Sequence, residues 1–332
     1  MIRKVFIFFA FTILHLSTLS CVSSNQKLYS DLIKLENTKK WKIVFSDGRD
    51  IYFLSIDGKY KPIEFKDKAF QLYPSFSPDG RRIAFCEIVG MKSSLLISDL
   101  NGDNIQILYK VDGNIDCVAW APDGNKILFL TNYNSEKASE DICLFDFKTH
   151  SIKTLVKELV YAESHYTPSW SPDSRKIVFA SMESYILIVD IISGDMQKLL
   201  KADAPSWAPD NQVISFREGH SYRKIYPDGS EEYIVEGDRY FTITPDGEKK
   251  NFLFKSEDHQ HLWGITRGAK APLVWSPDGR FILFFTHYSA IWNSMGTPYV
   301  YIMDVKSKET VCIGKLPTSS SIWGLSWAQQ NI

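Results

Sequence analysis

The sequence predicts an all-β protein that folds as a single β-propeller, and three observations point to this class. A short turn phrase close to Ser-Pro-Asp-Gly recurs along the chain, with apolar residues before and after it. A second phrase follows at the distance of another strand and ends in aspartate and a polar turn. The two ends of the chain carry complementary parts of one further repeat. Four short strands in each repeat of this length are typical of a propeller blade.

The turn phrase has the chemistry of a tight hairpin. In its first copy, Ser77-Pro78-Asp79-Gly80, proline presets the backbone for the second position of the turn. Serine and aspartate bond nearby backbone N–H groups, and glycine accepts a positive φ. Ser174 and Asn211 replace the glycine in two copies, and asparagine tolerates this geometry better than serine. We interpret each copy as the hairpin between the first and second strands of a blade. The prolines of the six copies are Pro78, Pro122, Pro172, Pro209, Pro245 and Pro277.

The second phrase predicts the third strand of a blade and its turn into the fourth. An apolar run ends in aspartate and continues as a polar turn, as in "LLISDLNG" from Leu95. The same pattern returns as "ICLFDFKT" from Ile142, "LIVDIISG" from Leu187 and "VYIMDVKS" from Val300. A fourth short strand is expected after each of these turns.

The chain ends predict one blade built from both termini. The segment from Trp41 has the second and third strands of a blade without a hairpin before them, whereas Ser321–Gln330 has a first strand and then stops. Pairing these strands would close the ring and remove an exposed edge. This arrangement predicts seven blades. Six is the alternative, because the blade from Arg239 to Lys270 lacks a clear fourth strand.

On these motifs the chain resembles the TolB-type β-propeller superfamily, from roughly Trp41 to its end. Similar blades occur in the propeller of prolyl oligopeptidases and in oligogalacturonate lyases. The resemblance implies the fold more than the function, because this fold carries many unrelated activities.

The front of the chain predicts export and a lipid anchor. Residues 1–20 carry Arg3 and Lys4 and then an apolar stretch too short to span a bilayer, which is typical of a signal peptide. The junction Ser20-Cys21 resembles the lipobox of bacterial lipoproteins, which implies cleavage before Cys21 and its lipidation. Residues 21–40 would form the tether and 41–332 the propeller. We expect the periplasmic side or the surface of a bacterial cell envelope. An ordinary cleaved signal is the alternative.

The composition and charge of the chain limit the classes of molecule that we expect it to bind. The net charge is −1 and the charges are interspersed, so we expect no nucleic-acid partner. The repeats form one domain, expected to be monomeric. The remaining cysteines lack metal-type spacing and are expected to be small buried residues, with a Cys86–Cys117 disulfide as the alternative. The acidic residues Glu87, Glu136, Glu140 and Asp141 are interpreted as solvated loop charges.

The long insertions predict where binding occurs. In a blade, the turns that join strands one to two and three to four share one face, and all other connections share the opposite face. Every long insertion falls on this second face, where variable loops on a rigid scaffold usually bind ligands. We expect it to bind a protein, peptide or glycan without catalysis and without a cofactor. The aromatic residues expected to make the contacts are Tyr133, Tyr166, Tyr288 and Trp292.

An enzyme is the alternative reading of the same face. Several histidines map to it, and neutral imidazoles that converge can bind a divalent transition metal. Oligogalacturonate lyases hold a metal with histidines, so the resemblance implies, as the alternative, a metal-dependent lyase or hydrolase acting on acidic sugars. The candidate ligands are His220, His259, His261 and His287. Serine hydrolase chemistry is not expected, because Gly219-His220-Ser221 is not followed by the second glycine of a nucleophile turn.

Overall fold

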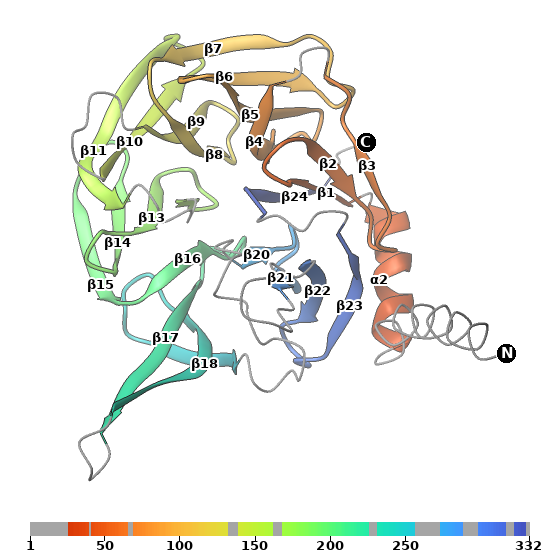
Figure 1. Ribbon diagram of the computed structural model, residues 1–332, viewed down its shortest axis with the longest axis vertical. Helices are drawn as coiled ribbons and strands as arrows, with labels where there is room; N and C mark the ends of the chain where they lie inside the picture. Colours follow the sequence, from red (N-terminus) through yellow and green to blue (C-terminus); the bar gives the residue numbers. More distant parts are fainter. Residues whose placement is uncertain are drawn as a thin grey trace, which may run out of the picture.

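The computed structural model describes residues 26–39, 41–65, 69–131, 139–161, 168–225, 231–255, 273–287, 298–316 and 322–329. Over these residues the chain forms the helix α2 (Gln26–Lys39) and six four-stranded antiparallel sheets. The sheets lie around a common centre, with their first strands innermost and their fourth strands at the rim (Figure 1). The predicted all-β propeller is therefore confirmed.

We call the six sheets blades A to F and give their strands from the centre outward. Blade A contains β24 (Leu325–Gln329), β1 (Trp41–Ser46), β2 (Ile51–Leu54) and β3 (Tyr60–Pro62). Blade B contains β4 (Phe70–Phe76), β5 (Arg82–Val89), β6 (Lys92–Asp99) and β7 (Gln106–Val111). Blade C contains β8 (Ile115–Trp120), β9 (Lys126–Thr131), β10 (Ser139–Asp146) and β11 (Ser151–Tyr161).

The other three blades repeat this order. Blade D contains β12 (Ser169–Trp170), β13 (Lys176–Ala180), β14 (Tyr185–Asp190) and β15 (Met196–Lys201). Blade E contains β16 (Asp203–Trp207), β17 (Ile214–Ile225), β18 (Glu231–Ile243) and β19 (Lys250–Lys255). Blade F contains β20 (Val274–Trp275), β21 (Phe281–His287), β22 (Pro298–Asp304) and β23 (Thr310–Lys315).

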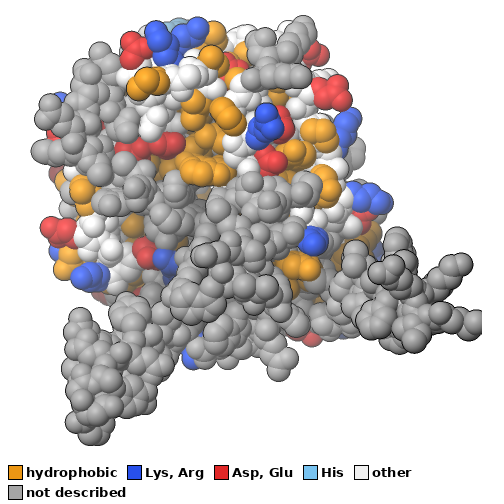
Figure 2. Space-filling view, viewed as in Figure 1, with side chains coloured by type: hydrophobic (Ala, Val, Ile, Leu, Met, Phe, Trp, Pro, Cys, Tyr) orange, Lys and Arg blue, Asp and Glu red, His pale blue; other side chains and the backbone are white. Residues whose placement is uncertain are grey.

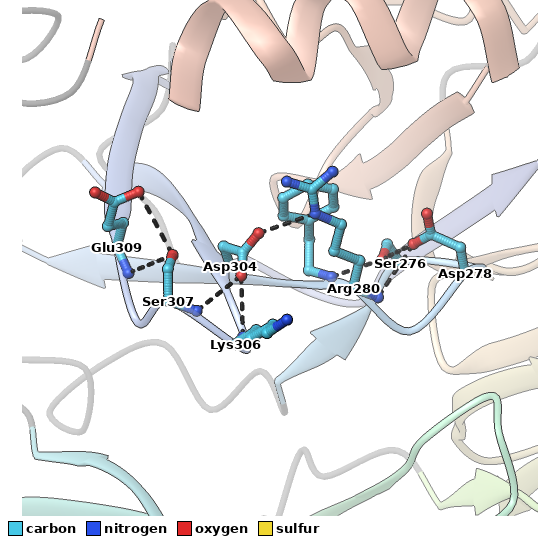
Figure 3. Close-up of polar contacts among 8 residues, drawn as sticks. Ser276, Asp278, Arg280, Asp304, Lys306, Ser307 and Glu309 are labelled. Carbon is cyan, nitrogen blue, oxygen red and sulfur yellow. Dashed lines mark hydrogen bonds and ion pairs between the residues drawn. The ribbon is translucent and has the colours of Figure 1, made fainter. Parts of the chain in front are cut away.

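The repeated phrases form the turns that their chemistry predicts. In blade F, the Ser276 hydroxyl donates to Asp278 Oδ1 at 2.7 Å, and the backbone N–H of Arg280 donates to the same oxygen at 3.1 Å (Figure 3). At the other turn of this blade, Asp304 Oδ1 accepts two backbone N–H bonds at 3.0 Å, from Lys306 and Ser307. Arg280 Nε lies 2.9 Å from Asp304 Oδ2 and ties the two turns together. Both turns therefore lie at the same end of the blade.

The blade count differs from the primary prediction of seven, because the described residues form six sheets. The phrase at Thr244-Pro245-Asp246-Gly247 joins β18 to β19, the third and fourth strands of blade E, rather than opening a new blade. Phe241 of β18 pairs with Phe216 on one side and with Phe252 on the other. Because the phrase encodes only a tight turn between antiparallel strands, it fits either turn of a blade.

Strands from the two ends of the chain pair as predicted. β24 runs antiparallel to β1, from Trp41 opposite Gln329 to Phe45 opposite Leu325. Helix α2, within the segment assigned to the tether, packs beside this blade. Leu28 and Leu32 are buried in a cluster that includes Ile56 and Ile313 of blades A and F. The folded body therefore includes this helix.

Candidate functional site

The strand order divides the propeller into two faces. The turns between strands one and two, present in blades B to F, and the turns between strands three and four lie at one end of the blades, which we call the short-turn face. The connections between strands two and three, and those between blades, lie at the other end, which we call the loop face. This division is the one that the sequence predicted.

An exposed apolar group marks the loop face of blade B. Phe70 begins β4, Val89 ends β5, and Met91 lies in the hairpin that follows. Their side chains are 52%, 62% and 91% exposed. We call these three residues the blade B patch. Figure 2 shows hydrophobic side chains gathered in the upper half of the face in view, over blades B and C.

The blade B patch was not predicted from the sequence. The available signal was the hairpin "VGMK", in which valine and methionine flank a glycine where polar residues are usual. Large apolar side chains that stay exposed in one place are typical of an interaction surface.

A carboxyl pair with one buried member lies between blades B and C. Asp116 of β8 and Glu140 of β10 lie on the same side of their sheet, because Asp116 pairs with Leu130 and Leu130 pairs with Ile142. Glu140 is 2% exposed, so its interpretation as a solvated loop charge was wrong. The signal in the sequence was its alternation with Ile142 and Leu144, which continues the buried side of the strand toward the loop.

Glu140 holds its proton at neutral pH. Burial, and then the neighbouring Asp116 carboxylate, raise the pKa of Glu140 to about 10. Glu140 is therefore a neutral acid that hydrogen-bonds to Asp116, and its Oε1 atom has no partner among the described residues. Tyr73 of blade B also hydrogen-bonds to Asp116, and burial raises the pKa of Tyr73 well above its usual range. The three side chains join the two blades.

Backbone bulges direct these side chains into the seam. Tyr73 and Cys117 have φ values of 54° and 55°, and the strand register shifts at the same places. A bulge turns a strand locally and re-aims its side chains. Because Glu140 is almost inaccessible to solvent, the pair is suited to holding blades together rather than to transferring a proton to a substrate.

The predicted binding residues lie mostly outside the described part of the chain. This holds for Tyr133, Tyr166, Tyr288 and Trp292, for Cys21, and for the histidines His259 and His261. His220 and His287 lie in β17 and β21, where their backbones pair with Glu236 and Pro298, but their side chains are outside the description. Whether the four histidines converge therefore stays a prediction.

Other predicted features can be located within the described residues. No group of three or more His, Cys, Asp or Glu side chains gathers there into a metal site. No helix in the described segments is long and apolar enough to cross a bilayer. Cys86, Cys117, Cys143 and Cys312 are buried as expected. Cys86 and Cys117 are free thiols rather than a disulfide, as is Cys143, whereas Cys312 is disulfide-bonded.

Comparison with known proteins places the fold. Residues 42–199 match the family described as the TolB beta propeller domain. Residues 42–199 of the chain therefore resemble a TolB-type β-propeller domain.

Two curated relatives match parts of this TolB-type propeller. Dipeptidyl-peptidase 5 of Porphyromonas gingivalis is 31% identical over 119 residues, which are 34% of this chain and 17% of that protein. Tol-Pal system protein TolB of Francisella tularensis subsp. tularensis is 28% identical over 138 residues, which are 39% of this chain and 31% of that protein. The chain therefore matches less than a third of the length of either relative.

Solved structures support the fold of the TolB-type propeller. TolB from Acinetobacter baumannii has a TM-score of 0.66 at 16% identity, with 91% of this chain and 71% of that chain covered. A putative TolB from Agrobacterium tumefaciens has a TM-score of 0.56 at 16% identity, with 88% and 99% covered. An oligogalacturonate lyase from Vibrio parahaemolyticus scores 0.45 at 13% identity, covering 84% and 85%, which is too distant to support the lyase alternative.

Proposed function

We propose that this protein is an exported, membrane-anchored, monomeric propeller that binds a protein partner through its loop face without catalysis. The observation that carries the proposal is the blade B patch, where Phe70, Val89 and Met91 are left exposed at one end of one blade. Exposed apolar side chains on a soluble surface are costly unless a partner covers them. The TolB relatives add support, because they are named as proteins of the Tol-Pal system.

Among the residues that the structure describes, the features of the propeller favour ligand binding over catalysis. The Glu140 carboxyl is closed to solvent, and the carboxyls of Asp146 and Asp304 have lowered pKa values within turns. The blade B patch instead presents side chains outward on strands that are firmly paired, since Phe70 lies opposite Ile88. A rigid apolar surface loses little entropy on binding.

The experiment is affinity capture from the membranes of the source cells with the full chain as bait. Replacing Phe70 and Met91 together with alanine should strongly reduce recovery of the partner, because apolar anchors dominate such interfaces. The matched control is the pair Ile192→Ala and Met196→Ala, which are 77% and 56% exposed on blade D but belong to the turn and strand after β14.

The proposal predicts loss with the Phe70 and Met91 substitutions and retention with the blade D control. Recovery of the same partner at equal yield by both double variants contradicts it. Recovery of a glycan or a free peptide instead of a protein would support binding at the loop face but contradict the proposal that the ligand is a protein.

A further inference from the structure

A pocket lies on the short-turn face, between blades A and B. Its volume is about 640 Å³, and its lining comes from β1, from β2 and β3 with the turn between them, and from the two turns of blade B. This face is opposite to the loop face, so the pocket is separate from the surface of the proposed function. Pockets of a few hundred Å³ are of the size that binds ligands rather than single ions.

The walls of the pocket are strongly basic. Lys42 and Lys61 line it from blade A, and Arg81 lines it from the first turn of blade B. None of these three side chains forms an ion pair with another described residue, whereas Lys59 lies 2.5 Å from the Asp57 carboxylate. The pocket therefore holds three positive charges that arise from three separate elements.

Asp99, the one acidic residue among those that line the pocket, is hydrogen-bonded within its own turn. Asp99 Oδ1 accepts the backbone N–H groups of Asn101 at 2.9 Å and Asp103 at 3.0 Å. Its Oδ2 accepts from the Asn104 side chain at 3.0 Å. These bonds occupy the carboxylate, so Asp99 does not pair with Lys42, Lys61 or Arg81.

The floor of the pocket is apolar and rigid. Phe53 and Leu100 are half-buried and pack against the apolar cluster between blades A and B, and Phe53 stacks on Phe76 of blade B with ring centroids 6.3 Å apart. Lys42 lies in β1 and also lines the pocket. Burial lowers the pKa of Lys42, because water solvates its ammonium group poorly there. A bound negative group would offset that cost.

We propose that this pocket binds an acidic peptide segment of a partner protein, with carboxylates at Lys42, Lys61 and Arg81 and apolar side chains on the floor. The positive charges stand on both walls, so a ligand with several negative charges matches them better than a single ion. The apolar floor favours a ligand that also carries hydrophobic groups. The proposal does not rest on the proposed function, because it concerns the opposite face.

The test is a binding titration with the full chain. The probe is a fluorescein-labelled heptapeptide that alternates glutamate and leucine, and its partner probe replaces every glutamate with lysine. Fluorescence anisotropy should show saturable binding of the acidic probe only, weakening as salt is added. The double variant Lys61→Gln and Arg81→Gln should weaken binding about tenfold, since two partly exposed ion pairs are lost.

A matched control separates this site from general positive charge. Arg175 occupies the same place in the turn of blade D as Arg81 does in blade B, and Lys201 lies exposed on the outer strand β15 as Lys61 does on β3. Arg175→Gln with Lys201→Gln should leave the affinity for the acidic probe unchanged. The Phe70 and Met91 alanine variant should also bind the probe normally, whatever becomes of the loop-face proposal.

Three outcomes overturn the proposal. The first is the absence of saturable binding of the acidic probe, and the second is equal affinity in the Lys61 and Arg81 variant. The third is binding of inorganic phosphate or of phosphatidylglycerol vesicles without binding of the peptide, because these results would assign the pocket to a small anion or to a lipid surface.

Discussion

At the scale of single residues, Glu140 shows how burial changes the chemistry of a side chain. Its folded-state pKa is raised from 4.5 to about 10, so the folded protein holds a proton that the unfolded chain releases near its ordinary pKa. The stabilisation linked to that proton is complete below the unfolded pKa. It is lost progressively as the pH rises toward the folded pKa.

This linkage predicts the behaviour of Glu140→Gln. The amide cannot ionise and keeps a donor for Asp116, so the variant should lose the part of the pH dependence that Glu140 causes. Between about pH 5 and about pH 9, the free energy of unfolding of the wild type should fall more steeply, by at most about 1.4 kcal/mol per pH unit. Urea denaturation at several pH values measures both slopes.

The control for this measurement is Glu183→Gln, an exposed glutamate in a turn of blade D. It should keep the slope of the wild type. Parallel slopes for the wild type and Glu140→Gln would show that Glu140 is ionised in the folded state.

At the scale of elements, the same turn chemistry serves different places in the fold. The turn at Thr244 looks like the hairpins that open blades, with Thr244 donating to Asp246 as Ser276 donates to Asp278. It nevertheless joins the last two strands of blade E. The preceding strands of 12 and 13 residues decide this, because their long pairing places Thr242 opposite Ser215.

Two glycines with similar backbones predict different tolerances. Gly58 and Gly90 both have positive φ, at 78° and 65°. A Cβ atom at Gly58 would press against the Ile313 carbonyl of blade F, whereas nothing lies within 4 Å of a Cβ at Gly90. Gly58→Ala should therefore lower the free energy of unfolding by about 2–5 kcal/mol and Gly90→Ala by about 1–2 kcal/mol. Chemical denaturation compares the two, and equal losses would show that blade F yields to the added methyl group.

At the scale of the whole molecule, the position of the chain ends matters for anchoring. Both ends contribute strands to blade A, and α2 packs on the neighbouring blade F, so the segment before α2 leaves from this side of the propeller. A lipid on Cys21 would hold this side near a membrane. The blades opposite A and F would then lie farther from the membrane than the anchored side.

The anchoring hypothesis predicts the behaviour of Cys21→Ser. The variant should lose metabolic labelling by a fatty-acid analogue and move from the membrane fraction to the soluble fraction, because serine cannot form the thioether. Immunoblotting of fractionated cells measures the distribution. Cys86→Ser, which changes a buried thiol in β5, should keep the label. Labelling that persists in Cys21→Ser would exclude lipidation at this residue.

The sequence alone determined the elements and the fold class of this protein. The repeats around Pro78 and Pro277, the aspartates that close the third strands, and the half-blades at the two ends are local patterns. Local turn and strand chemistry is enough to predict them. The pairing of β1 with β24 could be predicted as well, because it satisfies the backbone N–H and C=O groups that two unpaired edge strands would expose.

Only the tertiary structure decided what depends on contacts between distant residues. The number of blades required the register of β17 with β18, which no turn phrase encodes. The burial of Glu140 beside Asp116 and Tyr73 required the seam between two blades. The basic pocket required Lys42 and Arg81 to face each other across another seam, although they are 39 positions apart in the sequence. Burial and charge at such seams are properties of packing, so they arise only when the blades stand side by side.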